Sequence, residues 1–143
     1  AAGTLSGAQL APTGADPIAP IGDIAVTAGF NTVILLDHAG NVTEGPGFNA
    51  FAIKGDRLIT SGHGVLGGIT RRTVLEMAAE RGMTPEERPL PLDEFLEADE
   101  VFLSGNMNKV TPVTEFDGSP YQAGPVARRV REMYWDWAMS ERA

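Results

Sequence analysis

A glycine-rich segment at residues 62–68 constrains the fold of this chain more than any other feature. It reads Gly-His-Gly-Val-Leu-Gly-Gly and continues into Ile-Thr-Arg-Arg at 69–72, where apolar residues begin to recur at helical spacing. Glycines permit tight turns and a close approach of the backbone to a ligand, and the first turn of a helix favours an anion. The segment therefore predicts either a phosphate site at a helix N-terminus or a connector that holds no ligand.

The pattern around this segment predicts a mixed α/β (α+β) domain in which strands and hairpins are covered by a few helices. Apolar and β-branched runs between turn residues predict strands at 32–36, 49–54, 57–60, 100–103 and 110–116, with a turn at 104–108. Prolines at 89 and 91 allow an edge strand at best over 87–92. Helical spacing predicts helices at 69–81, at 92–96 and from 124 onward.

Single residues define the ends and faces of these helices. We expect Gly82 to end the first helix and Asp93 to cap the second. The last helix is expected to open at Gly124-Pro125. Its inward face is expected to carry Val126, Val130, Met133, Tyr134 and Trp137, with Arg128, Arg129 and Arg131 on a solvated face.

Gly62, Gly64 and Gly67 also match the spacing of the dinucleotide-binding fingerprint. A doubly wound fold needs long hydrophobic parallel strands around that loop. Here the preceding strand at 57–60 is short and is predicted to pair in a hairpin with 49–54. The match alone therefore does not favour a dinucleotide-binding fold.

Charge and composition exclude several classes of partner. The 143 residues carry 19 acidic and 11 basic side chains, for a net charge of −8, which argues against nucleic-acid or anionic-membrane binding. The absence of cysteine excludes thiolate metal sites and is compatible with a cytoplasmic location. Residues 1–28, rich in Ala, Gly and Pro, predict a linker, an extended arm or a covering segment, so the folded domain is expected at 29–143.

Further motifs occur in a fixed order along the chain. They are Leu36-Asp37, Thr43 to Asn49, Gly64 to Arg71, Asp99-Glu100-Val101, Thr111-Pro112-Val113 and Gly124-Pro125-Val126. Together they resemble the class IV aminotransferases, the fold-type-IV pyridoxal-phosphate enzymes that include branched-chain, D-amino-acid and (R)-selective amine transaminases. The resemblance implies the large domain of the D-amino-acid-aminotransferase fold and pyridoxal 5'-phosphate as cofactor. It also implies amino-group transfer between an amine or amino acid and a 2-keto acid, and a possible homodimer.

The resemblance also assigns roles to individual residues. Glu44 matches the acid that pairs with the pyridinium nitrogen, and Leu66 matches the residue on the ring face. The remaining cofactor contacts fall on Gly68, Ile69, Thr70 and Asn106, and substrate contacts fall on Met107 and Asn108. Two alternatives stay open at this point, because a lone glutamate is often a solvated turn residue and a leucine is often part of a core.

The family's Schiff-base lysine would fall near Thr13, within the Ala/Pro-rich segment, but the lysines of this chain are Lys54 and Lys109. No catalytic lysine is therefore assigned, and Lys109 stands as a candidate substitute. Two hypotheses follow. The chain is the large domain of a class IV aminotransferase that lacks the lysine and the small domain, or it is a non-catalytic or engineered domain that retains a phosphate cradle. No metal site is expected, since Asp37, Asn41 and Glu44 are too few to hold calcium.

Overall fold

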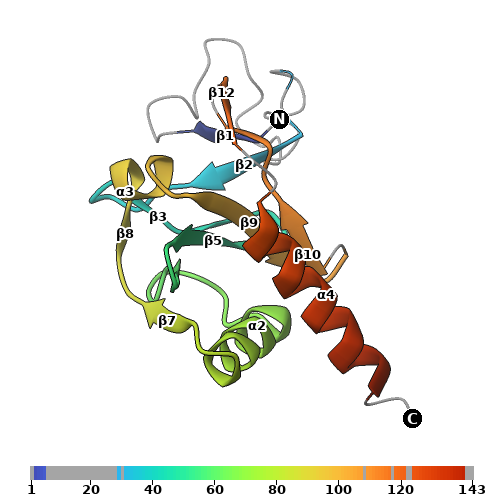
Figure 1. Cartoon of the computed structure of the whole chain (residues 1–143). Helices are drawn as coiled ribbons and strands as arrows, with labels where there is room; N and C mark the ends of the chain where they lie inside the picture. Colours follow the sequence, from blue (N-terminus) through green and yellow to red (C-terminus); the bar gives the residue numbers. More distant parts are fainter. Residues whose placement is uncertain are drawn as a thin grey trace.

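The computed structural model describes residues 2–5, 29, 31–107, 109–116, 118–121 and 124–140. Its strands form a six-stranded sheet, a four-stranded sheet and the short two-stranded sheet β3-β8, with helices packed against them (Figure 1). The strands are β1 (Ala2–Leu5), β2 (Thr32–Leu35), β3 (Asn41–Val42), β4 (Glu44–Gly45), β5 (Phe48–Lys54), β6 (Arg57–Thr60), β7 (Thr84–Glu87), β8 (Leu90–Pro91), β9 (Glu100–Gly105), β10 (Lys109–Pro112), β11 (Glu115–Phe116) and β12 (Ser119–Pro120). The helices are α2 (Ile69–Glu80), α3 (Leu92–Leu96) and α4 (Pro125–Ser140). The predicted mixture of strands and helices is confirmed.

The larger sheet has six strands in the order β10-β9-β5-β6-β7, with β4 paired to β5 at one end. The central pairs are antiparallel, which confirms the hairpin of β5 and β6. In contrast, β6 and β7 are parallel, and the connection between them carries the glycine-rich loop and α2. The loop therefore lies in one β-α-β unit at the edge of an otherwise antiparallel sheet, an arrangement that the predicted hairpin did not anticipate.

A second sheet has the order β12-β11-β1-β2. Here β1 runs parallel to β2 over four residue pairs, from Ala2 opposite Thr32 to Leu5 opposite Leu35. Residues 2–5 of the Ala/Gly/Pro-rich segment are thus a paired strand, which agrees with an extended arm rather than a free linker among the alternatives that composition left open. Residues 6–28 lie outside the described residues, so the prediction for that part stays a prediction.

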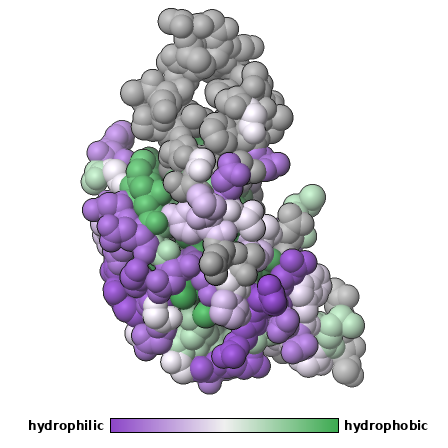
Figure 2. Space-filling model, turned by 45° about the horizontal axis from the view of Figure 1, so that its top comes forward, coloured by the Kyte–Doolittle hydropathy of each residue, from purple (hydrophilic) through white to green (hydrophobic). Residues whose placement is uncertain are grey.

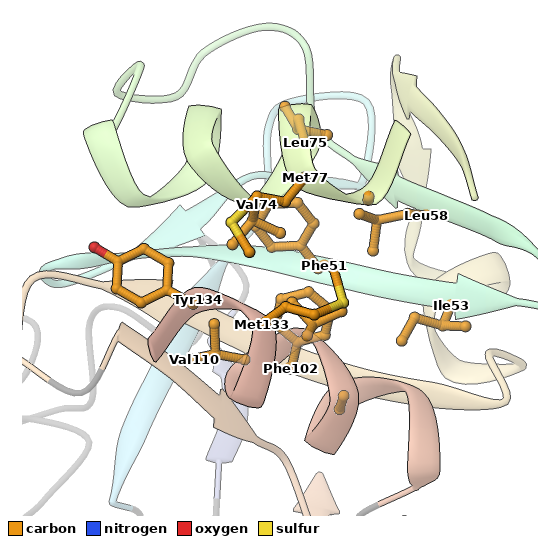
Figure 3. Packing of buried hydrophobic residues seen from close by; sticks show 13 residues of the cluster. Phe51, Ile53, Leu58, Val74, Leu75, Met77, Phe102, Val110, Met133 and Tyr134 are labelled. Carbon is orange, nitrogen blue, oxygen red and sulfur yellow. The ribbon is translucent and has the colours of Figure 1, made fainter. Parts of the chain in front are cut away.

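Two hydrophobic clusters lie on opposite faces of the larger sheet, as the alternating apolar pattern of β5 requires. Phe51 and Ile53 belong to the cluster covered by α2 and α4, whereas Ala50 and Ala52 belong to the other cluster. In the first cluster the rings of Phe51 and Phe102 stack with centroids 4.7 Å apart, between the two helices (Figure 3). The sheet is therefore buried on both faces, and α2 is held firmly against it.

Helix α4 begins under a buried carboxylate from the neighbouring sheet. Glu100 on β9 is 6% exposed and accepts hydrogen bonds from the backbone N–H groups of Val126 (3.1 Å) and Ala127 (2.7 Å). Gly124 leaves the space in which this side chain lies, because a Cβ at that position would collide with Glu100. The opening of the last helix at Gly124-Pro125 is confirmed, and its N-terminus is closed by the protein itself.

An ion cluster joins β6, β7 and α3 on the surface. Arg57 donates to Glu86 at 2.6 Å, and Arg88 donates to Glu86 at 2.8 Å and to Glu94 at 2.6 Å. The two guanidinium groups lower the pKa of Glu86 to about 2. Figure 2 shows a mainly hydrophilic face of the molecule, with hydrophobic residues exposed in small patches.

The predictions about strands need two corrections. Within 87–92 the described strand is the two-residue β8, paired with β3, which agrees with an edge strand at best. The edge strand of the larger sheet is β7, Thr84–Glu87, which was not predicted, and its Pro85 is tolerated because β7 is the last strand of that sheet. The run at 110–116 is divided between β10 and β11, which belong to different sheets. A short apolar run cannot reveal that the chain leaves one sheet for another within it.

The predicted turn at 104–108 is also too long, because β9 continues through Gly105, which pairs with Lys109 of β10. Ser104 is therefore a buried strand residue with 1% exposure. Hydrophilic residues at the end of a short run favoured a turn in the sequence, but pairing with both β5 and β10 extends the strand.

The predictions for the helices are mostly confirmed. Helix α2 ends before Gly82, which has a φ of +82°, as a glycine stop requires. Asp93 does not cap α3, because the N-cap residue is Pro91 and the Asp93 carboxylate accepts the N–H of Glu94 instead.

On the last helix, α4, Trp137 is 38% exposed rather than inward-facing. The three arginines of α4 are exposed as predicted, and no helix in the described part of the chain is long and apolar enough to cross a membrane.

Candidate functional site

A cavity of about 600 Å³ lies at the N-terminus of α2. Its walls come from β4, β5, the end of β9 and the loop that precedes the helix. The six residues predicted to contact a cofactor all line it, namely Glu44, Leu66, Gly68, Ile69, Thr70 and Asn106. Residues from distant parts of the sequence thus converge on one space, and we call it the α2 cavity.

The loop that forms one wall is held in place by a buried arginine of α2. Arg71 is 7% exposed, and its Nη2 donates to the carbonyl of Ser61 at 2.8 Å and to Glu87 at 2.7 Å. Gly62 lies so close to β7 that a Cβ there would be 2.9 Å from the Glu87 carbonyl oxygen. The loop is therefore fixed at its start, next to the end of β6 and β7.

The N-terminus of α2 is open toward the cavity. Its N-cap residue Gly68 offers no side-chain cap, and the first helical hydrogen bond runs from the N–H of Arg72 to the Gly68 carbonyl at 3.0 Å. The N–H groups of Ile69, Thr70 and Arg71 meet no acceptor among the described residues. With no acidic residue in the first turn, this helix end is suited to an anion from solution.

Glu44 lies at another wall of the cavity, in an orientation fixed by two hydrogen bonds. Its Oε2 accepts the backbone N–H of Leu66 at 2.8 Å and the side-chain amide of Asn49 at 3.1 Å. The Asn49 amide also donates to the Leu66 carbonyl at 3.0 Å, so the three residues hold each other in place. Glu44 Oε1 has no partner within the described residues. Glu44 is consequently a positioned carboxylate, and its interpretation as a solvated turn residue is wrong.

Two apolar side chains at the cavity are uncovered. Leu66 and Ile69 both line the α2 cavity, yet each is 74% exposed. The alternative that Leu66 is an ordinary core leucine is therefore wrong. Exposed apolar side chains beside convergent polar groups are typical of a site that binds a small molecule.

The sequence interpretation missed two polar residues of this cavity, Asn49 and Ser104. They are directly opposite each other in the β5–β9 pairing. Since Phe51 and Phe102 lie two residues further along the same strands and pack under α2, Asn49 and Ser104 also face α2. Asn49 was visible as the last residue of the Thr43–Asn49 motif, whereas no local signal marked Ser104.

Met107 and Lys109 are not among the residues that line the α2 cavity. Met107 is 91% exposed and borders an adjoining cavity of about 400 Å³, and Asn108 lies outside the described residues. Lys109 donates from Nζ to Asn106 Oδ1 at 3.2 Å, so its cation lies next to a residue of the α2 cavity. The other lysine, Lys54, is an exposed residue that pairs with Asp99 at 3.4 Å.

The side chains of Asp37 and Asn41 form hydrogen bonds within the turn at residues 37–41. The Asp37 carboxylate accepts N–H groups from Ala39 and Asn41 and the side-chain amide of Asn41, and these hydrogen bonds lower the pKa of Asp37. Among the residues that the structure describes, no three His, Asp or Glu side chains are grouped so as to hold a metal ion.

The fold and the cavity define a mixed α/β domain with an open helix N-terminus and a fixed carboxylate in the same cavity. The pattern of the family described as amino-transferase class IV matches residues 21–116. Because this match covers most of the chain, the protein belongs to the class IV aminotransferases.

Individual relatives agree with this family. A branched-chain-amino-acid aminotransferase of Pseudomonas aeruginosa is 39% identical over 116 residues, which are 78% of this chain and 38% of the relative. An aminotransferase from Brucella abortus, solved with the cofactor PLP, has a TM-score of 0.78 and 36% identity, covering 83% of this chain and 43% of that one. The branched-chain aminotransferase of Thermoproteus uzoniensis, solved with norvaline, gives a TM-score of 0.77 and 34% identity, with 80% and 39% covered. The chain thus spans about two fifths of the length of these relatives.

Proposed function

We propose that the α2 cavity binds pyridoxal 5'-phosphate and that this chain is the cofactor-binding part of a class IV aminotransferase. The observation that carries the proposal is that one cavity presents both the fixed carboxylate of Glu44 and the open N-terminus of α2. Pyridoxal 5'-phosphate carries a pyridine ring and a phosphate group. Its ring nitrogen needs a carboxylate such as Glu44, and its phosphate needs an anion-binding group such as the open N-terminus of α2. The cavity volume of about 600 Å³ is in the range of small-molecule sites.

Each lining group would then have a distinct task. Glu44 would keep a proton on the ring nitrogen, and its hydrogen bonds from Leu66 and Asn49 would keep the carboxylate aimed at that atom. Leu66 would cover one face of the ring. When bound, the cofactor supplies an electron-withdrawing ring that stabilises negative charge on the substrate carbon.

The other end of the site would hold the phosphate. The backbone N–H groups of Ile69 and Thr70 are free to donate, and the exposed Asn106 lines the same cavity. Gly68 must stay small, because a Cβ there would be 2.7 Å from Asn49 Oδ1. These residues fit a phosphate group without any change of the fold.

The substrates follow from the family. We propose transfer of an amino group between an amine or a branched-chain or other amino acid and a 2-keto acid, as the names of the Pseudomonas and Thermoproteus relatives suggest. Met107 and Asn108 would contact the substrate, with Met107 bordering the adjoining cavity. Homodimer formation, cytoplasmic location and a domain boundary at residues 28–29 stay predictions.

One observation favours the second candidate function, a cradle that binds the cofactor reversibly without catalysis. No lysine lines the α2 cavity in the part of the chain that is described: Lys54 pairs with Asp99, and Lys109 donates to Asn106 from outside the lining. In this alternative the cavity binds the phosphate and ring, but no amine of this chain attacks the cofactor.

Titration of the protein with pyridoxal 5'-phosphate, followed by visible absorption and calorimetry, tests the proposed function. We expect saturable binding that is weakened at least tenfold by Glu44→Gln and unchanged by Glu76→Gln, an exposed glutamate of α2. Borohydride treatment and mass spectrometry then separate the two candidates, since a covalent adduct on Lys109 supports catalysis and its absence supports the cradle. If wild-type protein does not bind the cofactor at all, both candidates are wrong.

A further inference from the structure

The charge balance of the α2 cavity leaves a phosphate without a side-chain counter-charge. A phosphate monoester carries about −1.5 to −2 charges at neutral pH, whereas a helix N-terminus contributes about half a positive charge. Among the described residues that line the cavity, Glu44 is the one charged side chain, and it is negative. Arg71 lies near this helix end but does not line the cavity; its Nη2 donates to Glu87 and the Ser61 carbonyl, and its Nε is buried with no partner among the described residues.

Lys109 is the basic residue placed to supply that charge. Its Nζ donates to Asn106 Oδ1 at 3.2 Å, and Asn106 lines the cavity beside the N-terminus of α2. The contact is exposed, so the flexible lysine can exchange the amide oxygen for a phosphate oxygen without a change in the backbone. Other basic side chains of the described chain make their hydrogen bonds or ion pairs away from the cavity, or are exposed on α2 and α4.

The backbone at Lys109 is a second, independent observation. Its φ is +56°, in the left-handed region that favours glycine, and it is the one non-glycine residue with a positive φ in the described chain. Such a conformation is strained for a non-glycine residue. Strained residues of this kind concentrate at binding sites, and Lys109 begins β10, three residues after Asn106.

Ser104 provides a third observation on the same wall. The residue is 1% exposed, it lines the α2 cavity, and its buried Oγ has no hydrogen-bond partner. A buried hydroxyl without a partner is unfavourable, so its presence in the wall of this cavity indicates a ligand acceptor. Gly105, which follows it, cannot carry a side chain, because a Cβ there would collide with the Gly47 carbonyl.

We propose that Lys109 is the counter-cation for the phosphate group of the ligand and that the Ser104 hydroxyl donates a hydrogen bond to the same group. Lys109 would leave Asn106 Oδ1 and pair with the phosphate held at the N-terminus of α2. The proposal rests on the proposed function for the identity of the ligand, but the anion site itself can be tested with inorganic phosphate.

Comparison of three ligands separates the role of charge from that of the ring. Pyridoxal 5'-phosphate, pyridoxal and inorganic phosphate are titrated by calorimetry into wild-type protein and Lys109→Gln. We expect the variant to bind both phosphate-containing ligands about tenfold more weakly and pyridoxal with unchanged affinity. Lys54→Gln is the matched control, since it removes a lysine that pairs with Asp99 away from the cavity. An unchanged ratio of phosphate to pyridoxal affinity in Lys109→Gln would overturn the proposal.

Two further variants at position 109 separate charge, strain and covalent chemistry. Lys109→Arg keeps the charge but cannot form a covalent adduct, so it should retain phosphate affinity within about threefold. Lys109→Gly relieves the positive φ, so its melting temperature should not fall while its phosphate affinity falls as in Lys109→Gln. If Lys109→Gly keeps full affinity, the lysine serves only the turn and the proposal is wrong.

Ser104→Ala tests the hydroxyl. The substitution removes a buried group without a partner, so stability should be unchanged or slightly higher, and phosphate affinity should fall about threefold to tenfold. A lower melting temperature with unchanged affinity would assign Ser104 a structural role only. If wild-type protein binds inorganic phosphate but not pyridoxal 5'-phosphate, the proposed function fails and the anion site survives. If it binds neither, both proposals fail.

Discussion

Helices α2 and α4 both begin directly after a glycine and pack on the same face of the larger sheet, but their N-termini differ. At α4 every group is satisfied, because Pro125 has no N–H, Val126 and Ala127 donate to Glu100, and Arg128 donates to Gly124. At α2 the N–H groups of residues 69–71 have no acceptor within the described structure, and they border a cavity.

The same local arrangement, a glycine before a helix and a polar side chain of the sheet beside it, has a different consequence at α4 and at α2. At each helix end a glycine leaves room for an oxygen-bearing side chain of the sheet, Glu100 beside Gly124 and Asn49 beside Gly68. Glu100 turns its carboxylate to the helix, whereas Asn49 turns its amide to Glu44 and Leu66. The helix end that the protein leaves unsatisfied is therefore the one that can take an anion from solution.

Removal of the carboxylate at α4 should give the largest effect. Glu100→Ala deletes two hydrogen bonds from buried N–H groups, so we expect a loss of about 2–3 kcal/mol in the free energy of unfolding, measured by urea denaturation. Glu100→Gln keeps one acceptor oxygen and should lose less. Phosphate binding by the folded fraction should not change, and a loss below about 0.5 kcal/mol would contradict the assigned role.

A carboxylate introduced at the start of α2 should make its N-terminus resemble that of α4, which already has an acidic partner. Ile69 is 74% exposed at the first helical position, so Ile69→Asp should stabilise the helix by about 0.3–1 kcal/mol through its dipole. The same charge should repel a phosphate and weaken its binding about tenfold, as measured by calorimetry. Ile69→Asn controls for the lost apolar side chain. Equal phosphate affinity in the two variants would show that the open helix end is not the anion site.

The smallest effect is expected at the ion cluster, which lies at neither helix end. The pKa of Glu86 is lowered from 4.5 to about 2, so its contribution to stability is present above pH 4.5 and is lost as the pH falls toward 2. Because the side chain is partly exposed, Glu86→Gln should cost only about 1 kcal/mol at neutral pH. The unfolding free energy of this variant should also depend less on pH over that range. An unchanged acid transition would contradict this assignment.

The sequence alone determined most of the local structure and the identity of the family. The apolar run at 49–54 predicted the strand β5, and helical spacing after the glycine-rich segment predicted the helix that begins at Ile69. These features depend on neighbours within a few residues, so periodicity and turn chemistry reveal them. The ordered motifs also located Glu44, Leu66 and Asn106, because a family pattern records residues that converge even when the sequence separates them.

Only the tertiary structure decided which of these groups are satisfied and which are free. Glu100 reaches a helix 25 residues later, Ser104 is buried because β9 pairs on both sides, and Lys109 reaches Asn106 across a strained turn. Each outcome depends on the register between strands and on the packing of a helix over them. Local sequence specifies a helix N-terminus, but the distant residue opposite it decides whether that end is capped or open to a ligand.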